Sequence, residues 1–337
     1  MKKILSILSA TFLVFMACQN PASSTAFSSA TSTGVTVTVN GTGTGARNLN
    51  GATTVKLNVF NSSGVQVGST QTLSTSPYKF SVPISTNGTY TFAVQGLSGT
   101  SIVAVGNVSQ NITGATSLTI TAAAPPTPDM TATATLTGWG TLLGTGSGSS
   151  WGGVISNTYV TSDGSNLYVS TIMNPQNAGN NIYVLVDDSS LTGGEAVTAN
   201  LMGWGTLGIT TDNVGTNFDY GWVAYRGSTA GGTFSVGAEK SVSGGTESAV
   251  GTAATYVQYS TGTTNADVAT YKWKIPYSDL GPGAAMGQNV KVYILFGQSG
   301  SSGGIHSTFP AQTAMSSVTS ANSLTTLDTA PTAVTLN

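Results

Sequence analysis

Alternation of apolar and polar residues with a period of two is the feature that most constrains the fold of this chain. The stretch 159–188 shows it best, because residues 166–172 and 181–186 alternate in this way and Asp-Gly and Asn/Gly clusters bound both runs. Such runs, rich in β-branched and aromatic residues, predict two β-strands. The second run leads directly into Asp187 and Asp188. A β-sheet with two carboxylates at a strand end is therefore the first expectation.

Length and composition extend this expectation to the whole chain. A chain of 337 residues predicts about two domains, each with its own core. Only 7% of the residues are charged, yet 39% are hydrophobic and there are 12 Tyr, 10 Phe and 5 Trp, which indicates a folded rather than a disordered chain. The net charge of −2 and the scattered Lys and Arg residues argue against nucleic acid as a partner. We expect an all-β protein with a surface of hydroxyls and amides.

Residues 1–18 are expected to be a lipoprotein-type signal peptide. Two lysines precede an apolar run at 4–17, and Cys18, the only cysteine, follows it. The run is too short to span a bilayer and suits the core of a secretory signal. Cys18 resembles the lipidated cysteine of the bacterial lipobox, with Phe15 in place of the usual Leu, as in spirochaetes and their relatives. We expect lipidation of Cys18 and anchoring to the outer membrane; the alternative is a plain signal peptide and an incidental cysteine.

The rest of the chain divides into a tether, two β-sandwiches and a linker. Residues 19–33 form a Ser/Thr-rich tether. Residues 34–122 contain about seven short alternating runs, which predict an immunoglobulin-like sandwich. These runs are 35–39, 55–60, 65–67, 78–84, 89–94, 101–108 and 117–121.

Residues 123–130 are rich in proline and are expected to be a stiff linker that holds the two domains apart. Residues 131–337 are too long for seven strands and predict a larger β-sandwich or jelly roll. Further strands are expected at 131–136, 153–160, 218–226, 253–260, 270–275 and 290–297.

Several motifs of the second unit resemble the family-nine-like carbohydrate-binding modules, which are related to the DOMON domains. In chain order they read YVTSDGSNLYVS, NNIYVLVDD, NFDYGWVAYR, YKWKIPYSDLG and GQNVKVYILFGQSG, and the resemblance covers roughly residues 157–312. It implies a β-sandwich fold. It says less about the ligand, because DOMON relatives bind sugars, haem or nothing known.

Catalysis is not expected. A serine triad needs a histidine base, and His306, the only histidine, has no G-x-S-x-G motif near it. Zinc needs several His or Cys ligands, and haem would need His306 with a methionine, whereas a solvated loop histidine is the simpler interpretation. A glycosidase needs two carboxylates at a set separation, and Asp187 and Asp188 are adjacent. We expect a protein that is not an enzyme.

Sugar binding is the expected function of the second sandwich. Sugar rings pack on Trp or Tyr, while acids, amides and Arg hold the hydroxyls. The run 218–226 places Tyr220, Trp222 and Arg226 on one strand face, which is either a binding platform or a core stripe. Trp273 is expected in the core. The candidate ligand-binding residues are Trp151, Trp204, Trp222, Arg226 and Tyr220.

Asp187 and Asp188, with Glu195 nearby, offer oxygen ligands that suit Ca²⁺. The alternative is that both aspartates accept hydrogen bonds from turn amides. No cofactor other than calcium is expected.

Two classes of function remain open. The first is a non-catalytic lipoprotein of the cell surface or periplasm that binds a polysaccharide or glycan. The second is a structural or adhesive extracellular protein, such as a surface-layer or filament subunit, that associates with itself through edge strands.

Overall fold

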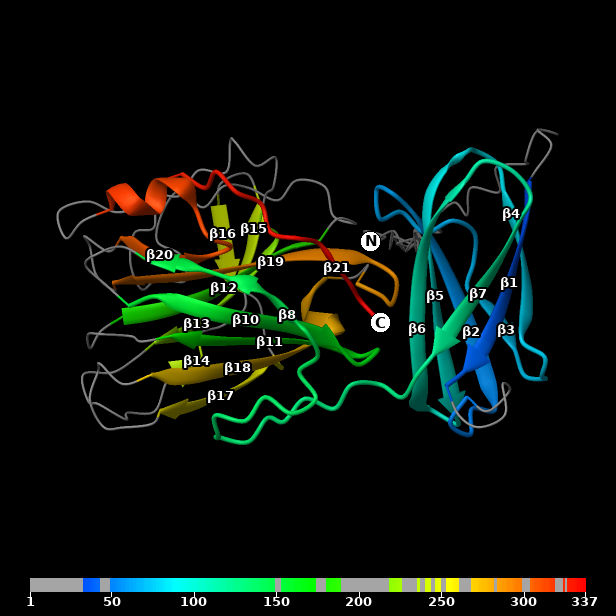
Figure 1. Cartoon of the computed structure of the whole chain (residues 1–337), viewed down its shortest axis with the longest axis horizontal. Coiled ribbons are helices and arrows are strands. Elements are labelled where there is room, and N and C mark those ends of the chain that lie inside the picture. Colours follow the sequence, from blue (N-terminus) through cyan, green and yellow to red (C-terminus); the bar gives the residue numbers. More distant parts are fainter. Residues whose placement is uncertain are drawn as a thin grey trace, which may run out of the picture.

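A computed structural model describes residues 33–42, 49–148, 153–173, 180–188, 218–225, 235–236, 240–243, 246–249, 253–260, 268–281, 284–298, 304–318, 324 and 326–337. In these residues the chain forms two successive β-sandwiches (Figure 1). The only helical elements among them are short 3-10 turns. The prediction of an all-β fold is therefore confirmed.

In the described residues, the first sandwich has seven strands in two sheets, ordered β4-β1-β7 and β3-β2-β5-β6. Its strands are β1 (Thr33–Gly41), β2 (Thr54–Asn61), β3 (Gln71–Leu73), β4 (Lys79–Ile84), β5 (Gly88–Ser98), β6 (Ser101–Ile112) and β7 (Thr116–Ala122). The run at 65–67 returns along β2 after the turn at 61–64, because Gln66 forms an antiparallel bridge with Phe60 and Val67 N donates to Val59 O (2.7 Å). The short strand β3, which then pairs with β2, was not predicted.

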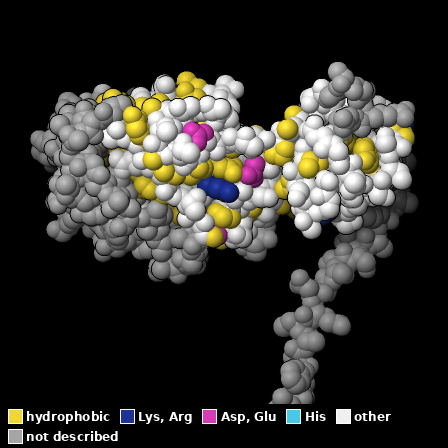
Figure 2. Space-filling view, turned by 90° about the horizontal axis from the view of Figure 1, so that it is seen from below, with side chains coloured by type: hydrophobic (Ala, Val, Ile, Leu, Met, Phe, Trp, Pro, Cys, Tyr) yellow, Lys and Arg dark blue, Asp and Glu magenta, His cyan; other side chains and the backbone are white. Residues whose placement is uncertain are grey.

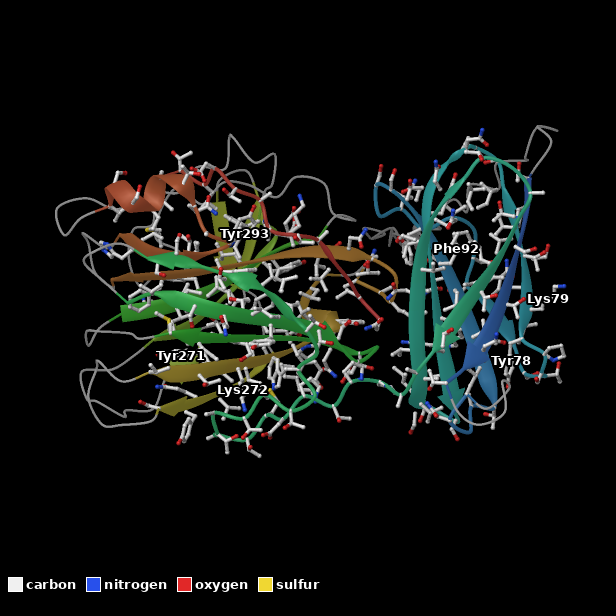
Figure 3. All side chains as sticks on the ribbon, in the orientation of Figure 1. Tyr78, Lys79, Phe92, Tyr271, Lys272 and Tyr293 are labelled. Atoms are coloured by element: carbon white, nitrogen blue, oxygen red, sulfur yellow. The ribbon has the colours of Figure 1, made fainter. Side chains whose placement is uncertain are left out.

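Alternation decides which side chains fill this sandwich. Val35, Val37 and Val39 of β1 are buried, whereas the threonines between them are partly exposed. Phe92 of β5 is fully buried between the sheets (Figure 3). A side-chain period of two on a sheet with one covered face produces this pattern.

The second sandwich packs a five-stranded sheet, ordered β17-β18-β11-β10-β8, on a larger sheet whose main order is β16-β15-β13-β12-β19-β20-β9, with β14 and β21 off that path. Its strands are β8 (Leu142–Thr145), β9 (Ser147–Gly148), β10 (Ile155–Ser162), β11 (Asn166–Met173), β12 (Asn180–Asp188), β13 (Tyr220–Tyr225), β14 (Ser235–Val236), β15 (Lys240–Ser243), β16 (Thr246–Ala249), β17 (Thr255–Ser260), β18 (Ala269–Pro276), β19 (Asn289–Gln298), β20 (Ile305–Phe309) and β21 (Val334–Thr335). The 3-10 turns η2 (Tyr277–Asp279) and η3 (Thr313–Ser317) follow β18 and β20.

The two strands at the centre of the sequence analysis, β11 and β12, lie in different sheets and face the same core. Leu167 and Val169 of β11 meet Ile182 and Val184 of β12 in one buried cluster. The opposite face of the larger sheet is covered as well, because Tyr183 and Leu185 lie in a second cluster with Met315 of η3.

Between β7 and β8, residues 129–139 contact the outer face of the five-stranded sheet, and we call these residues the strap. Lys272 of β18 is 1% exposed, and its ammonium donates to Thr131 O (3.0 Å) and Thr135 O (2.8 Å) in the strap (Figure 3). Trp139 is fully buried and lies edge-on to Tyr168 of β11, with ring centroids 6.0 Å apart.

The strap corrects two expectations. Residues 131–136 form bends rather than a strand, because two carbonyls four residues apart converge on one nitrogen. In an extended strand those carbonyls would be roughly 13 Å apart. Nor is the proline-rich segment a spacer that holds the domains apart, since it leads directly into the strap that is bound to β18.

The two sandwiches are in contact, with strands that run in different directions in the view of Figure 1. Phe60 of β2 points away from its own core, yet it is only 2% exposed, because Gly287 of the second sandwich lies against its ring. Gln95 Nε2 donates to Gly164 O (2.9 Å), and Asn107 Nδ2 donates to Asn337 Oδ1 (2.8 Å). The four-stranded sheet of the first sandwich therefore supports one end of the second.

Figure 2 shows a described surface made mostly of uncharged polar side chains and backbone, with few charged groups. This agrees with the small charged fraction of the sequence.

Candidate functional site

The candidate site lies on the inner face of the second sandwich, where aromatic side chains of both sheets pack into one cluster. From the five-stranded sheet come Tyr271 and Trp273 of β18, with ring centroids 6.3 Å apart, and Tyr256 of β17, whose ring lies 5.0 Å from that of Trp273. From the larger sheet come Tyr220 and Trp222 of β13, with centroids 6.5 Å apart.

Strand register explains why these rings gather. Tyr256 is the cross-strand partner of Trp273, so both side chains point to the same face of the five-stranded sheet. Tyr220 and Trp222 are two residues apart on β13 and share its inner face. We call these five residues the aromatic cluster.

Exposure divides the aromatic cluster into a base and a rim. Trp222, Tyr271 and Trp273 are fully buried, whereas Tyr220 and Tyr256 are only partly buried. The prediction of Trp273 in the core is confirmed. For the face of the run 218–226, the core stripe is the correct one of the two alternatives at Trp222, which lies in the core and is not an exposed platform. The other face of β13 is covered by the cluster around Phe218 and Val223.

The base of the cluster carries a polar atom without a partner. Among the described residues, Trp273 Nε1 is buried and makes no hydrogen bond. A buried donor without an acceptor costs about 1–3 kcal/mol.

Carboxylates lie at the end of the larger sheet next to Tyr220. Asp188 is fully buried and sits on the same strand face as Val186, which pairs with Tyr220. Asp188 N donates to Asp219 Oδ2 (2.7 Å), and Asp219 itself is 6% exposed. Asp187 points to the other face of β12, where it pairs with Lys291 of β19 (3.4 Å).

Burial dominates the electrostatics of these acids. Burial raises the pKa of Asp219 to about 7; the hydrogen bond from Asp188 N opposes this shift, and the charges of Asp187 and Asp188 add to it. Burial also raises the pKa of Asp187, although the Lys291 ammonium acts in the opposite direction. A carboxyl with its pKa near neutrality can both donate and accept hydrogen bonds.

The acids do not assemble the expected metal site among the described residues. No group of three His, Cys, Asp or Glu residues able to hold a metal ion occurs there. Lys291 already compensates the charge of Asp187. Glu195 lies outside the described residues, so calcium bound by Asp187, Asp188 and Glu195 stays a prediction.

Other predicted residues also lie outside the described residues. They are Trp151, Trp204 and Arg226 of the predicted sugar site and the predicted lipidation residue Cys18. The nearest described neighbours of Trp151 and Arg226 are Gly153 and Tyr225.

His306 does not lie in a solvated loop, so that interpretation is wrong. It belongs to β20 and is 4% exposed, and burial lowers its pKa below the ordinary value. The run of Gly and Ser before it favoured a loop, and the pairing of β20 with β19 and β9 overrides that local preference.

Sequence reasoning missed three residues of the site: Asp219, Tyr256 and Tyr271. Tyr271 could have been found, because it is two residues from Trp273 and therefore shares its face. Asp219 and Tyr256 could not, because their positions depend on which strands pair and in what register.

No described helix is long and apolar enough to cross a membrane. No known protein-family model matches the chain, and no curated protein matches it. Several solved structures show a distant likeness, and three of them are described below. A DUF3823 family protein from Parabacteroides merdae has 16% identity and a TM-score of 0.19, over 46% of this chain and 67% of that one.

A DUF4876 family protein from Bacteroides thetaiotaomicron has 15% identity and a TM-score of 0.19, over 57% of this chain and 43% of that one. The RrgB pilus protein from Streptococcus pneumoniae has 10% identity and a TM-score of 0.16, over 80% of this chain and 50% of that one. At such TM-scores these likenesses carry no argument about fold or function. The fold rests on the strands and their pairing.

Proposed function

We propose that this chain is an exported, non-catalytic lipoprotein whose second sandwich binds carbohydrate at the rim of the aromatic cluster. The observation that supports this most is the cluster itself. Two partly buried tyrosines, Tyr220 and Tyr256, lie over a base of buried aromatic rings. Sugar rings present C–H faces that pack on aromatic rings, and such clusters with a few polar groups are typical of ligand sites.

The polar groups around the rim suit a neutral sugar. Asp219, which is next to Tyr220 in the chain and 6% exposed, can accept a hydrogen bond from a hydroxyl, and its raised pKa lets its protonated form donate as well. Among the described residues near these acids, the ammonium of Lys291 is already paired with Asp187. An uncharged polysaccharide therefore fits the site better than an acidic one.

Export and lipidation rest on the sequence of residues 1–18, with the apolar run and Cys18. The scarcity of charge and the Ser/Thr-rich surface agree with an extracellular location.

Tyr256→Ala is the decisive variant, because it removes a partly buried rim ring and leaves the three fully buried rings of the base in place. Tyr259→Ala is its matched control, since Tyr259 lies on the same strand and its partner Thr270 faces away from the core. Loss of one stacking ring costs roughly 1 kcal/mol, so the dissociation constant should rise about fivefold in Tyr256→Ala. The control should bind as the unmodified protein does.

Binding is measured by affinity electrophoresis and calorimetry against a panel of neutral and acidic polysaccharides. The proposal fails if the unmodified protein binds none of them, or if both variants weaken binding equally. Electron microscopy of the purified protein without ligand tests the alternative. Ordered filaments or sheets in that sample would favour a structural subunit.

A further inference from the structure

One short sequence motif occurs in the first sandwich but not in the second, and it has no part in the proposed sugar site. The sequence Asn-x-Ser/Thr, in which x is not proline, is the acceptor for N-linked glycosylation. It occurs five times between residues 34 and 122, at Asn40, Asn61, Asn87, Asn107 and Asn111. None of the 13 asparagines between 131 and 337 begins such a motif. Both units are rich in Ser and Thr, so this richness does not explain the difference.

Two of the five motifs lie at one end of the first sandwich. Asn87 is exposed in the connection between β4 and β5, and Asn111 is exposed near the end of β6. Their hydroxyl residues, Thr89 and Thr113, are exposed too. Thr89 is the cross-strand partner of Asn111, so the two motifs are neighbours.

The side chains of these two motifs are available. No hydrogen bond joins the side-chain amides of Asn87 and Asn111, or the side-chain hydroxyls of Thr89 and Thr113, to another described residue. The nitrogen that would carry a sugar is therefore accessible at both positions.

The Asn107 motif is different, although Asn107 is also exposed. Its amide nitrogen donates to Asn337 Oδ1 (2.8 Å) across the contact between the sandwiches. Its hydroxyl residue, Ser109, is bonded to the hydroxyl of Thr91 (2.8 Å). A sugar on Asn107 would have to displace the second sandwich at this point.

The remaining two motifs are also constrained. Asn61 Oδ1 accepts hydrogen bonds from Ser63 N and Val65 N (both 3.0 Å), which fixes the amide within a turn. Asn40 is partly buried on β1, paired with Thr121 of β7.

We propose that Asn87 and Asn111 are N-glycosylated and that Asn107 is not. The reaction joins the amide nitrogen to the anomeric carbon of a sugar and breaks the bond from that carbon to a phosphate-linked leaving group. The amide proton passes to a carboxylate of the glycosyltransferase, and the phosphate leaves with the bonding electrons. A glycan here has a physical purpose, because a chain in which only 7% of the residues are charged has little electrostatic repulsion against association.

The proposal goes beyond sugar binding by the second sandwich and rests on the proposed export of the chain. Its test is glycopeptide mass spectrometry on the protein purified from the cells that naturally make it. Peptides with Asn87 and Asn111 should carry added sugar mass, and the peptide with Asn107 should not. Thr89→Val should remove the modification at Asn87, whereas Thr89→Ser, which keeps the motif, should retain it.

Unmodified peptides for both Asn87 and Asn111 would overturn the proposal, as would equal occupancy at Asn107. Retention of sugar at Asn87 in Thr89→Val would also overturn it. These outcomes do not depend on the aromatic cluster, so they are distinguishable from failure of the polysaccharide binding assay.

Discussion

The contact between the sandwiches leads to a quantitative prediction at Gly287. This residue has φ of +98°, and a Cβ added to it would lie 2.7 Å from two ring atoms of Phe60 and 2.9 Å from Ala93 Cβ. Gly287→Ala therefore carries two costs. A non-glycine residue at positive φ costs about 1–2 kcal/mol, and overpacking against the ring costs about 1–3 kcal/mol more.

Gly51 separates the two costs. Its φ is +81°, and an added Cβ would meet nothing within 4 Å. Gly51→Ala should therefore lower the free energy of unfolding by about 1–2 kcal/mol, and Gly287→Ala by about 2–5 kcal/mol. Urea unfolding of both variants, followed by circular dichroism, gives the two values.

A double-mutant cycle then identifies the partner. Phe60→Ala removes the ring that the new methyl group meets, so part of the cost of Gly287→Ala should disappear in the double variant. The expected coupling is about 1–3 kcal/mol. Equal costs for the two glycine variants, with no coupling to Phe60, would refute the packing of the sandwiches.

Two further predictions concern buried charges. Lys272→Met removes the ammonium that binds Thr131 O and Thr135 O, so thermolysin should cleave the strap faster. Lys274→Met, on the same sheet face, should leave the cleavage rate unchanged. The variant no longer buries a charge, which offsets the lost hydrogen bonds, so the free energy of unfolding should change less than the rate of strap cleavage. Equal cleavage rates in both variants would contradict this. Asp219 has a pKa of about 7 in the folded chain and near 3.8 in the unfolded chain. Between these pH values the folded state binds more protons than the unfolded state. The free energy of unfolding therefore falls as the pH rises from about 4 to 7. Asp219→Asn, which can still accept the bond from Asp188 N, should flatten this fall and raise the Tm at about pH 8; an unchanged pH profile by calorimetry would show that Asp219 is not buried as described.

Much of the fold could be predicted from the sequence because alternation is a local signal. Residues 166–172, 181–186 and 270–275 formed strands close to the predicted bounds. The pattern also placed Val35, Val37 and Val39 in a core. The short strands β8, β9 and β20 were missed, because they have few residues and their pairing partners are far along the chain.

The candidate site was predictable only in part. The face shared by Tyr220 and Trp222 follows from alternation, but whether that face is core or surface does not. Burial of Trp222 depends on the five-stranded sheet that packs over it, and no local sequence pattern specifies how the two sheets pack. For the same reason the strap was mistaken for a linker and a strand, since its contact with Lys272 of β18 depends on the tertiary fold.

The sequence by itself determined that this chain is an all-β protein of two units with little charge, because strand periodicity and composition are properties of neighbouring residues. Only the tertiary structure decided that the two units pack together, that Trp222 lies at the base of an aromatic cluster, and that Tyr256 and Asp219 lie beside it. These facts depend on strand register and on contacts between residues far apart in the chain. Such contacts exist only after the sheets have paired and excluded water from the core.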